Sequence, residues 1–279
     1  MSIKSTVLFT GSVMEYWRTY FSNRRFPENQ EYYIVYTNLD HAIPFHPDAA
    51  LNYWMINFKF VPTATRLGDT LPAERFSEIR HTYLEIVSQG VAVFRAVPTV
   101  MPHFAGNNSR SPLQAWSFLK PINCSPSLHT AAPFFIYNLG AKYFPEQESE
   151  LRRHIGDIVS TVIRSKYHAM IDIAFGMFLC RRIIEEKLGI EFHPLETFFL
   201  QEQSARDKIP YEHVFRLYRE INDIAKTNSN AANLSELMES YFKQIGLPRV
   251  RQEKSNCFYD LDEKTLVYPP ELKVGRGVF

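Results

Sequence analysis

The chain is 279 residues long, and its composition excludes several classes of protein before any motif is considered. Hydrophobic residues make up 45% of it and aromatic residues 14%, so it can bury a sizeable core in one large domain or in a domain with an appendage. The formal net charge of +1 at pH 7 offers no long-range attraction for nucleic acid or for an anionic membrane. We therefore expect no nucleic-acid partner.

The three cysteines, Cys124, Cys180 and Cys257, indicate a reducing compartment, because they are odd in number, far apart and without the paired spacing of a zinc site. The first residues carry only a short apolar run, which does not form the hydrophobic region of a secretory signal. No segment reaches the roughly 18 uninterrupted apolar residues of a membrane-spanning helix. We expect a soluble, cytoplasmic protein with no transmembrane segment, and contact with a membrane surface stays open.

Helical periodicity dominates the first part of the chain. Residues 8–22 and 49–61 are predicted as helices, joined by an irregular segment. From Pro72 onward apolar residues recur at spacings of three and four, which indicates one face of a long helix. Pro98 and Pro102 end or kink that helix, because proline lacks the amide hydrogen that the helix needs.

The same periodicity continues beyond a polar loop at residues 103–112. A short helix is predicted to begin near His129, and a long one to run from residue 148 to 187, with Gly189 as its stop signal. Residues 211–226 then begin a further pair of helices.

The second helix of this pair covers residues 233–246, and Asn233 and Ser235 are alternative caps for it. After Gly246 the periodicity is lost, so the tail is predicted as surface wrapping or partial disorder. No set of strands is evident, and the predicted fold class is all-α. We expect a helical core over residues 1–190 and a C-terminal extension over residues 191–279.

Two histidines carry the chemistry that the sequence suggests. His168 and Asp172 are four residues apart in a predicted helix, so they share a face, and the carboxylate can accept from Nδ1 and leave Nε2 available. His129 follows a turn at Pro126 and Ser127, whose next amides point out of a helix N-terminus and can hold an anion. Taken alone, His129 is more typical of a buried, hydrogen-bonded structural histidine, and His168 with Asp172 is more typical of a surface ion pair.

Together, the segments around these residues resemble a known family. "NCSPSLHTA" and "TVIRSKYHAMIDIAFG" are similar to the second and third signature motifs of the type 2 phosphatidic acid phosphatase superfamily. The Pro-Ser-Leu-His form is like that of its inositol-phosphotransferase branch. That branch also carries a stretch ahead of its motifs, which is matched here by Asp40, Ile43, Pro44, Phe45 and Pro47. The resemblance covers roughly residues 38–187 and implies a helical bundle of the phosphatase and haloperoxidase type, with additional C-terminal helices.

The resemblance also implies a mechanism. His168 would attack phosphorus and form a phosphohistidine, Asp172 would orient it, and His129 would protonate the leaving group and later activate water or an alcohol. The amides after Ser127 would hold phosphoryl oxygens, and the scheme requires no cofactor. The expected substrate is a phosphate or diphosphate ester with an apolar prenyl or lipid portion.

The chain departs from the family at the cations that bind phosphate. No Arg-Pro dipeptide of the first motif occurs, His103 stands where the branch has an arginine, and Thr161 and Val162 replace the usual opening of the third motif. Candidate replacements are Arg95, Lys120, Arg164 and Lys166.

Other functions stay open. Residues 219–238 are somewhat similar to the magnesium-binding helix of terpene synthases, with Asn222 at one ligand position, so a cyclase that ionises a prenyl diphosphate with Mg²⁺ is the main alternative. A vanadium haloperoxidase would need more vanadate-binding cations than the sequence supplies, and we do not expect vanadate. A non-catalytic ligand-binding relative is the last alternative.

Overall fold

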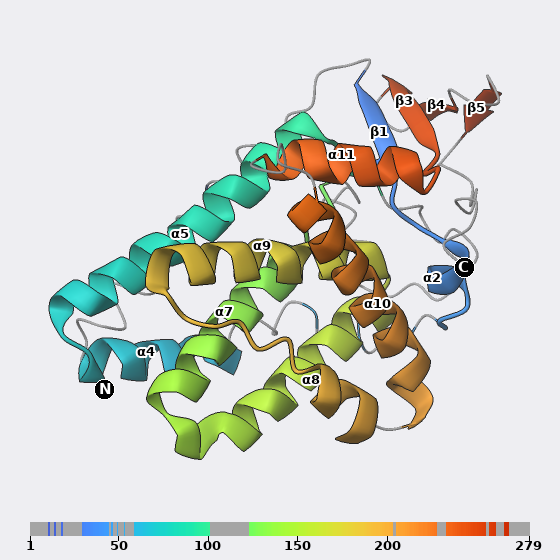
Figure 1. Ribbon diagram of the computed structural model, residues 1–279. Helices are drawn as coiled ribbons and strands as arrows, with labels where there is room; N and C mark the ends of the chain where they lie inside the picture. Colours follow the sequence, from blue (N-terminus) through green and yellow to red (C-terminus); the bar gives the residue numbers. More distant parts are fainter. Residues whose placement is uncertain are drawn as a thin grey trace.

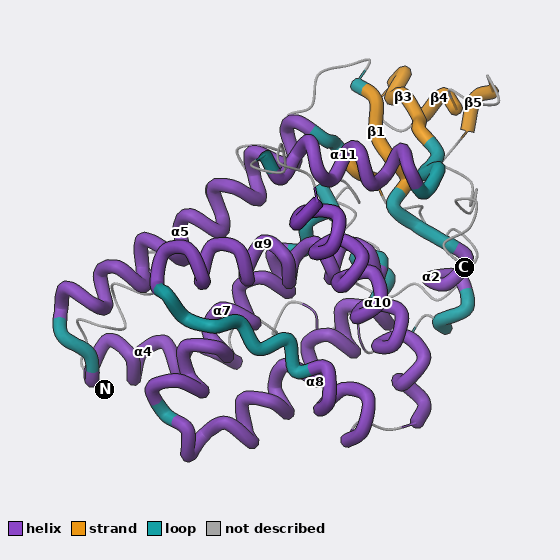
Figure 2. Tube along the Cα trace, in the orientation of Figure 1, coloured by secondary structure: helices purple, strands orange, loops and turns teal. Residues whose placement is uncertain are grey.

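The computed structural model is mostly helical, with a small sheet at one end (Figures 1 and 2), so the predicted all-α class is confirmed. The structure describes residues 11, 14, 18, 30–44, 46, 49, 53, 59–100, 123–202, 205–227, 233–254, 257–260 and 265–267. The predicted loop at 103–112 and most of the predicted helix at 8–22 lie outside these residues. Within the predicted helix at 49–61, Ala49 and Tyr53 are helical.

Helix α7 (Leu128–Tyr143) lies inside the helical part and packs against α4 (Val61–Thr70), α5 (Ala73–Ala96), α8 (Glu148–Arg164) and α9 (Met170–Leu188). A helix that is apolar on all sides is stable only when neighbours cover it. The sequence of α7 is of this kind, and nearly all of its first three turns are buried. Helix α5 runs along one side of the molecule, ending just before Pro98, as predicted (Figure 1).

The sequence predicts one continuous helix over residues 148–187. This prediction is wrong about its continuity, because the structure has two helices there, α8 and α9. The chain leaves the helix at Ser165, whose hydroxyl donates to the carbonyl of Val162 at 3.1 Å. Lys166 follows with φ of 57°, a left-handed conformation that interrupts any α-helix. Helix α9 ends as predicted, with Gly189 at φ 60°.

The predicted helix pair near the C-terminus is confirmed as α10 (Ala205–Thr227) and α11 (Leu234–Gln244). Asn233 caps α11, since its side chain accepts a hydrogen bond from the amide of Ser235 at 3.0 Å. Helix α10 packs on α9, and α11 contacts α5. The division of the chain at residue 190 stays a prediction.

The sheet corrects the prediction that the chain forms no strands. Its strand order is β2 (Thr99–Val100), β1 (Glu31–Ile34), β3 (Arg249–Lys254), β4 (Cys257–Asp260) and β5 (Thr265–Val267). Strand β1 pairs in parallel with β2 and antiparallel with β3, so the C-terminal segment predicted as irregular closes onto the N-terminal part of the chain. Strands β2 and β5 have only two and three residues, and the longer β1 and β3 do not alternate apolar with polar residues, which is the pattern on which strand prediction depends.

A short helix, α2 (Asn38–His41), follows β1 and carries Asp40 of the segment that matches the phosphotransferase branch; Ile43 and Pro44 come after the helix, and Phe45 and Pro47 lie outside the described residues. Helix α11 lies between the sheet and α9: the ring of Phe242 is 5.4 Å from that of Tyr33 and 5.7 Å from that of Phe175. Among the described helices, none combines the length and the apolar character needed to cross a lipid bilayer.

Candidate functional site

The structure brings the two predicted histidines together. His129 is the second residue of α7, and His168 lies in the loop 165–169 between α8 and α9. Their ring centroids are 5.8 Å apart, and the side chains are 6% and 7% exposed. A reacting group placed between the rings would therefore face both imidazoles in a site largely shielded from water.

The tautomer of neutral His168 follows from its partners. Nδ1 lies 2.8 Å from the carbonyl oxygen of Cys124, and a carbonyl only accepts, so Nδ1 carries the proton. Nε2 then holds a lone pair, and the hydroxyl of Tyr53, 3.1 Å away, donates to it. Asp172 Oδ2 is 3.5 Å from Nδ1, which is long for a hydrogen bond. The predicted acceptor, Asp172, is therefore farther from Nδ1 than the backbone carbonyl of Cys124.

Asp172 is fully buried at the start of α9. Its Oδ2 accepts from the amide of Ala169 at 2.8 Å, so the carboxylate caps the helix as well as facing His168. Burial raises the pKa of Asp172, while the neighbouring His168 side chain and the hydrogen bond from the amide of Ala169 act in the opposite direction. The prediction that His168 and Asp172 lie one turn apart within a helix is wrong for His168, which precedes the helix.

The turn before α7 is fixed by the sheet. In β2, the hydroxyl oxygen of Thr99 accepts from the amides of Cys124 and Ser125 at 2.9 and 3.1 Å. The amide of Asn123 donates to the carbonyl of Thr99 at 2.9 Å. This arrangement holds the Cys124 carbonyl that selects the tautomer of His168.

The same turn packs directly on α9. The amide of Ser127 donates to the carbonyl of Asp172 at 2.9 Å. A Cβ at Gly176 would stand 2.5 Å from the carbonyl oxygen of Ser127, so only glycine allows this approach. Ser127 is buried and is the N-cap residue of α7, and the positive end of the helix dipole therefore lies beside the histidines.

Tyr53 contacts both histidines, and no sequence motif identifies it as a site residue. Its ring stacks on Tyr167 with centroids 4.4 Å apart and tilts against His129 at 4.6 Å. It is 6% exposed. A lone tyrosine outside every recognised motif gives no reason to select it, although its hydroxyl contacts the nitrogen that would react.

Asp40, from the segment that matches the phosphotransferase branch, anchors the loop that carries His168. Its Oδ2 accepts from the amide and the hydroxyl of Thr37 at 3.0 and 2.7 Å, and its Oδ1 accepts from the amide of Met170 at 2.8 Å. Met170 lies two residues after His168. Burial raises the pKa of Asp40 to about 6 despite these hydrogen bonds.

Lys166 anchors the loop on the other side, two residues before His168. Its ammonium donates to the backbone carbonyl of Asp40 and lies 5.5 Å from the ring centroid of Tyr36. Burial lowers the pKa of Lys166 to about 8. One residue, Asp40, thus holds both flanks of His168, and the predicted phosphate ligand Lys166 makes a structural contact.

The other predicted cations lie in different places. Arg95 is exposed in the last turn of α5, and half-buried Arg164 ends α8 and lines a cavity that neither histidine lines. Lys120 and His103 lie outside the described residues. The phosphate-binding set thus stays a prediction.

Asn222 is buried in α10 and already bonded. Its Oδ1 accepts from Arg181 Nη1 at 2.8 Å, and its amide donates to the carbonyl of Tyr218. A guanidinium beside this oxygen disfavours a Mg²⁺ ion at the same position. Within the part of the chain that the structure describes, no three His, Cys, Asp or Glu side chains form a group that could hold a metal ion.

Comparison with known proteins gives no relative: no family, no curated protein and no solved structure matches the chain.

Proposed function

We propose that His129, His168 and Asp172 form the centre of an enzyme that hydrolyses or transfers a phosphoryl group from an ester with an apolar portion. The observation that carries the proposal is the hydrogen bond from His168 Nδ1 to the Cys124 carbonyl, because it leaves the lone pair on Nε2, in a ring whose centroid is 5.8 Å from that of His129. A merely structural histidine needs no second buried imidazole so close to its ring. The motif resemblance supplies the reaction class.

In the proposed first step, Nε2 of His168 forms a bond to phosphorus while the bond from phosphorus to the ester oxygen breaks. His129, protonated, gives its proton to the departing oxygen. In the second step water or an alcohol attacks phosphorus, His129 takes its proton, and the bond between phosphorus and nitrogen breaks. The enzyme returns to its starting state, so no oxidant or other reactant is needed.

The surroundings support each step. The carboxylate of Asp172 and the carbonyl of Cys124 face Nδ1, where positive charge develops when Nε2 is phosphorylated. The positive end of α7 favours the phosphoryl oxygens. Tyr53 donates to Nε2 before substrate binds, so the phosphoryl group must displace this hydroxyl.

Cyclisation of a prenyl diphosphate receives no comparable support, because the oxygen of Asn222 is used by Arg181. The cytoplasmic location and the prenyl or lipid nature of the substrate stay predictions.

The test is release of orthophosphate from decyl phosphate and from farnesyl phosphate or diphosphate, with and without Mg²⁺. We expect turnover without the metal and a loss on the order of 10³-fold or more in His168→Gln. The matched control is His81→Gln, which alters an exposed histidine on α5. An unchanged rate in a folded His168→Gln variant would contradict the proposal, as would intact pyrophosphate as the only anion released.

A further inference from the structure

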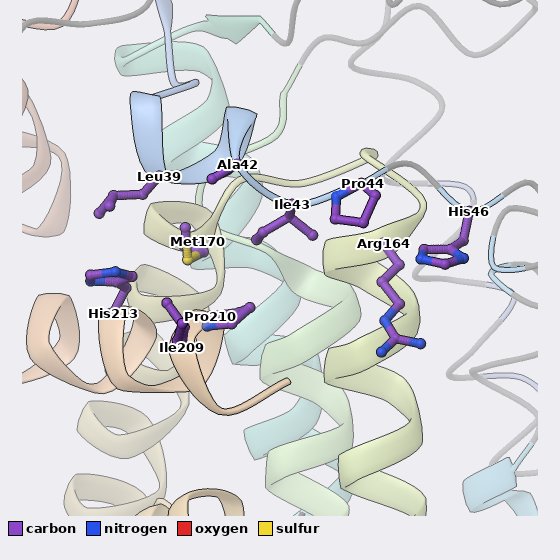
Figure 3. A pocket seen from close by; sticks show the side chains of 10 residues that line it. All are labelled: Leu39, Ala42, Ile43, Pro44, His46, Arg164, Met170, Ile209, Pro210 and His213. Atoms are coloured by element: carbon purple, nitrogen blue, oxygen red, sulfur yellow. The ribbon is translucent and has the colours of Figure 1, made fainter. Parts of the chain in front are cut away.

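A cavity of about 280 Å³ adjoins the loop that carries His168, since Arg164 and Met170, which flank that loop, both line it (Figure 3). Its walls come from α2 and the segment after it, from the junction of α8 and α9, and from the start of α10. Leu39, Ile43, Met170 and Ile209 form much of the apolar surface. The volume is near the lower end of small-molecule sites, about 300 Å³.

The cavity has a polar end and an apolar end. Figure 3 shows Arg164 and His46 side by side at one end, with Leu39, Met170 and Ile209 toward the other. No acidic side chain is among the described residues that line it. Arg164 carries a permanent positive charge, and a guanidinium has enough donors to bind an anion while it keeps another partner.

A third basic residue, His213, lines the apolar end. Burial lowers its pKa, and the charge of Arg216 lowers it further, so the neutral imidazole is favoured there. The positive charge of the cavity is therefore concentrated at Arg164, which suits a ligand with one charged head.

Hydrogen bonds between distant segments fix the walls. The amide of His46 donates to the carbonyl of Arg164 at 3.1 Å, which ties the segment after α2 to the end of α8. The carboxylate of Asp40 holds the amide of Met170 at 2.8 Å on the opposite wall. A cavity tied in this way is formed before a ligand arrives, which reduces the entropy that binding costs.

Ile209 lies at the rim and is 65% exposed. Its side chain is among those that line the cavity, so part of its exposed apolar surface borders the cavity opening. A ligand tail that fills the cavity would cover it.

We infer that this cavity binds a small amphipathic anion: a carboxylate or phosphate head at Arg164, with a hydrocarbon chain against Ile43, Met170 and Ile209. The inference does not rest on the proposed catalysis, because neither His129 nor His168 lines the cavity. Anion and chain together select the ligand, since the head pairs with the guanidinium and each methylene that is buried increases the affinity further.

The test is calorimetric titration of the whole protein with decanoate and with decyl phosphate, below the concentrations at which they form micelles. Decanol and inorganic phosphate are the comparison ligands. We expect both anions, or one of them, to bind at least tenfold more tightly than either comparison ligand. Selectivity between the two anions assigns the head group. A dissociation constant for decanol or for inorganic phosphate equal to those of the anions would overturn the inference.

Two variants locate the ligand. Arg164→Met removes the charge at the head, and Ile209→Asp places a negative charge at the rim on a side chain that is already exposed. We expect each to weaken binding about tenfold or more. The matched control Arg153→Met changes an exposed arginine on the same helix, α8, outside the cavity. Equal affinities in all variants, each shown to be folded by its thermal transition, would overturn the assignment of this cavity.

Discussion

The histidine centre and the cavity both adjoin the loop 165–169, yet they are built in opposite ways. His168 is bonded at both ring nitrogens, and Asp40 holds both of its flanks. The cavity is mostly apolar, has one permanent charge at Arg164, and is open at the exposed Ile209. The first arrangement fixes the direction of a lone pair, whereas the second selects a ligand by shape and charge.

This difference predicts separate responses to substitution. Changes around His168 should alter the rate of reaction through geometry while affinity for amphipathic anions in the cavity persists. The predictions that follow test that separation, starting from the largest expected effect.

His129→Gln should lower turnover of decyl phosphate by about 10²–10⁴-fold, because an alkoxide is a poor leaving group without a proton donor. With p-nitrophenyl phosphate the loss should be much smaller, since nitrophenolate leaves without protonation. The rate of the first turnover, in which decanol or nitrophenolate is released, measures the ratio, because the second step needs His129 as the base with both substrates. An equal loss on both would contradict the role of His129 as the general acid. Decyl phosphate affinity at the cavity should stay unchanged under non-turnover conditions.

Gly176→Ala should destabilise the protein by up to about 3 kcal/mol, because the new methyl group meets the backbone carbonyl of Ser127 at 2.5 Å. Urea denaturation measures the free energy of unfolding. Gly11→Ala is the control, since a Cβ there has nothing within 4 Å. Equal stabilities of the two variants would show that the turn before α7 does not need this close approach.

Asp40→Asn should lower the free energy of unfolding by about 2 kcal/mol, because an amide cannot accept all the hydrogen bonds that the carboxylate accepts from Thr37 and Met170. If Asp40 positions His168, the variant should also shift the ring resonances of His168 in ¹⁵N NMR spectra and lower turnover. Thr82→Val, which removes a hydroxyl that bonds within α5, is a control for stability alone. Unmoved His168 resonances would assign Asp40 a purely structural role.

The pH dependence of this variant has a defined sign. Burial raises the pKa of Asp40 to about 6 in the folded protein, from an ordinary value of 3.8, so the folded state binds the proton more tightly. The contribution to stability is fully present below the unfolded value and is lost as the pH rises through about 6. Urea titrations should therefore show the wild type gaining stability over Asp40→Asn, on the order of 2–3 kcal/mol, between pH 6 and 4. A constant difference over this range would contradict the raised pKa.

Regular helices and their end signals were predictable because they depend on nearby residues. The period of α5, the stop at Gly189 and the cap at Asn233 all follow local rules. The break between α8 and α9 does not, since the apolar period continues through it. A long-range hydrogen bond from Lys166 to Asp40 stabilises the break.

The same distinction applies to the candidate site. Motifs selected His129, His168 and Asp172, which the structure brings together. The partners that set the chemistry of His168 were missed: the carbonyl of Cys124 is a backbone atom, and Tyr53 is distant in sequence. Backbone acceptors carry no residue-type signal, so a sequence cannot indicate which of them will face a ring.

The most direct measurement of the central claim is to trap the covalent intermediate. The protein is mixed with decyl phosphate, quenched in base, where phosphohistidine survives, and digested for mass spectrometry. We predict a phosphoryl group on the peptide that contains His168, and its absence in His168→Gln. Turnover without any phosphoryl group on His168, or with one on another residue, would contradict the account.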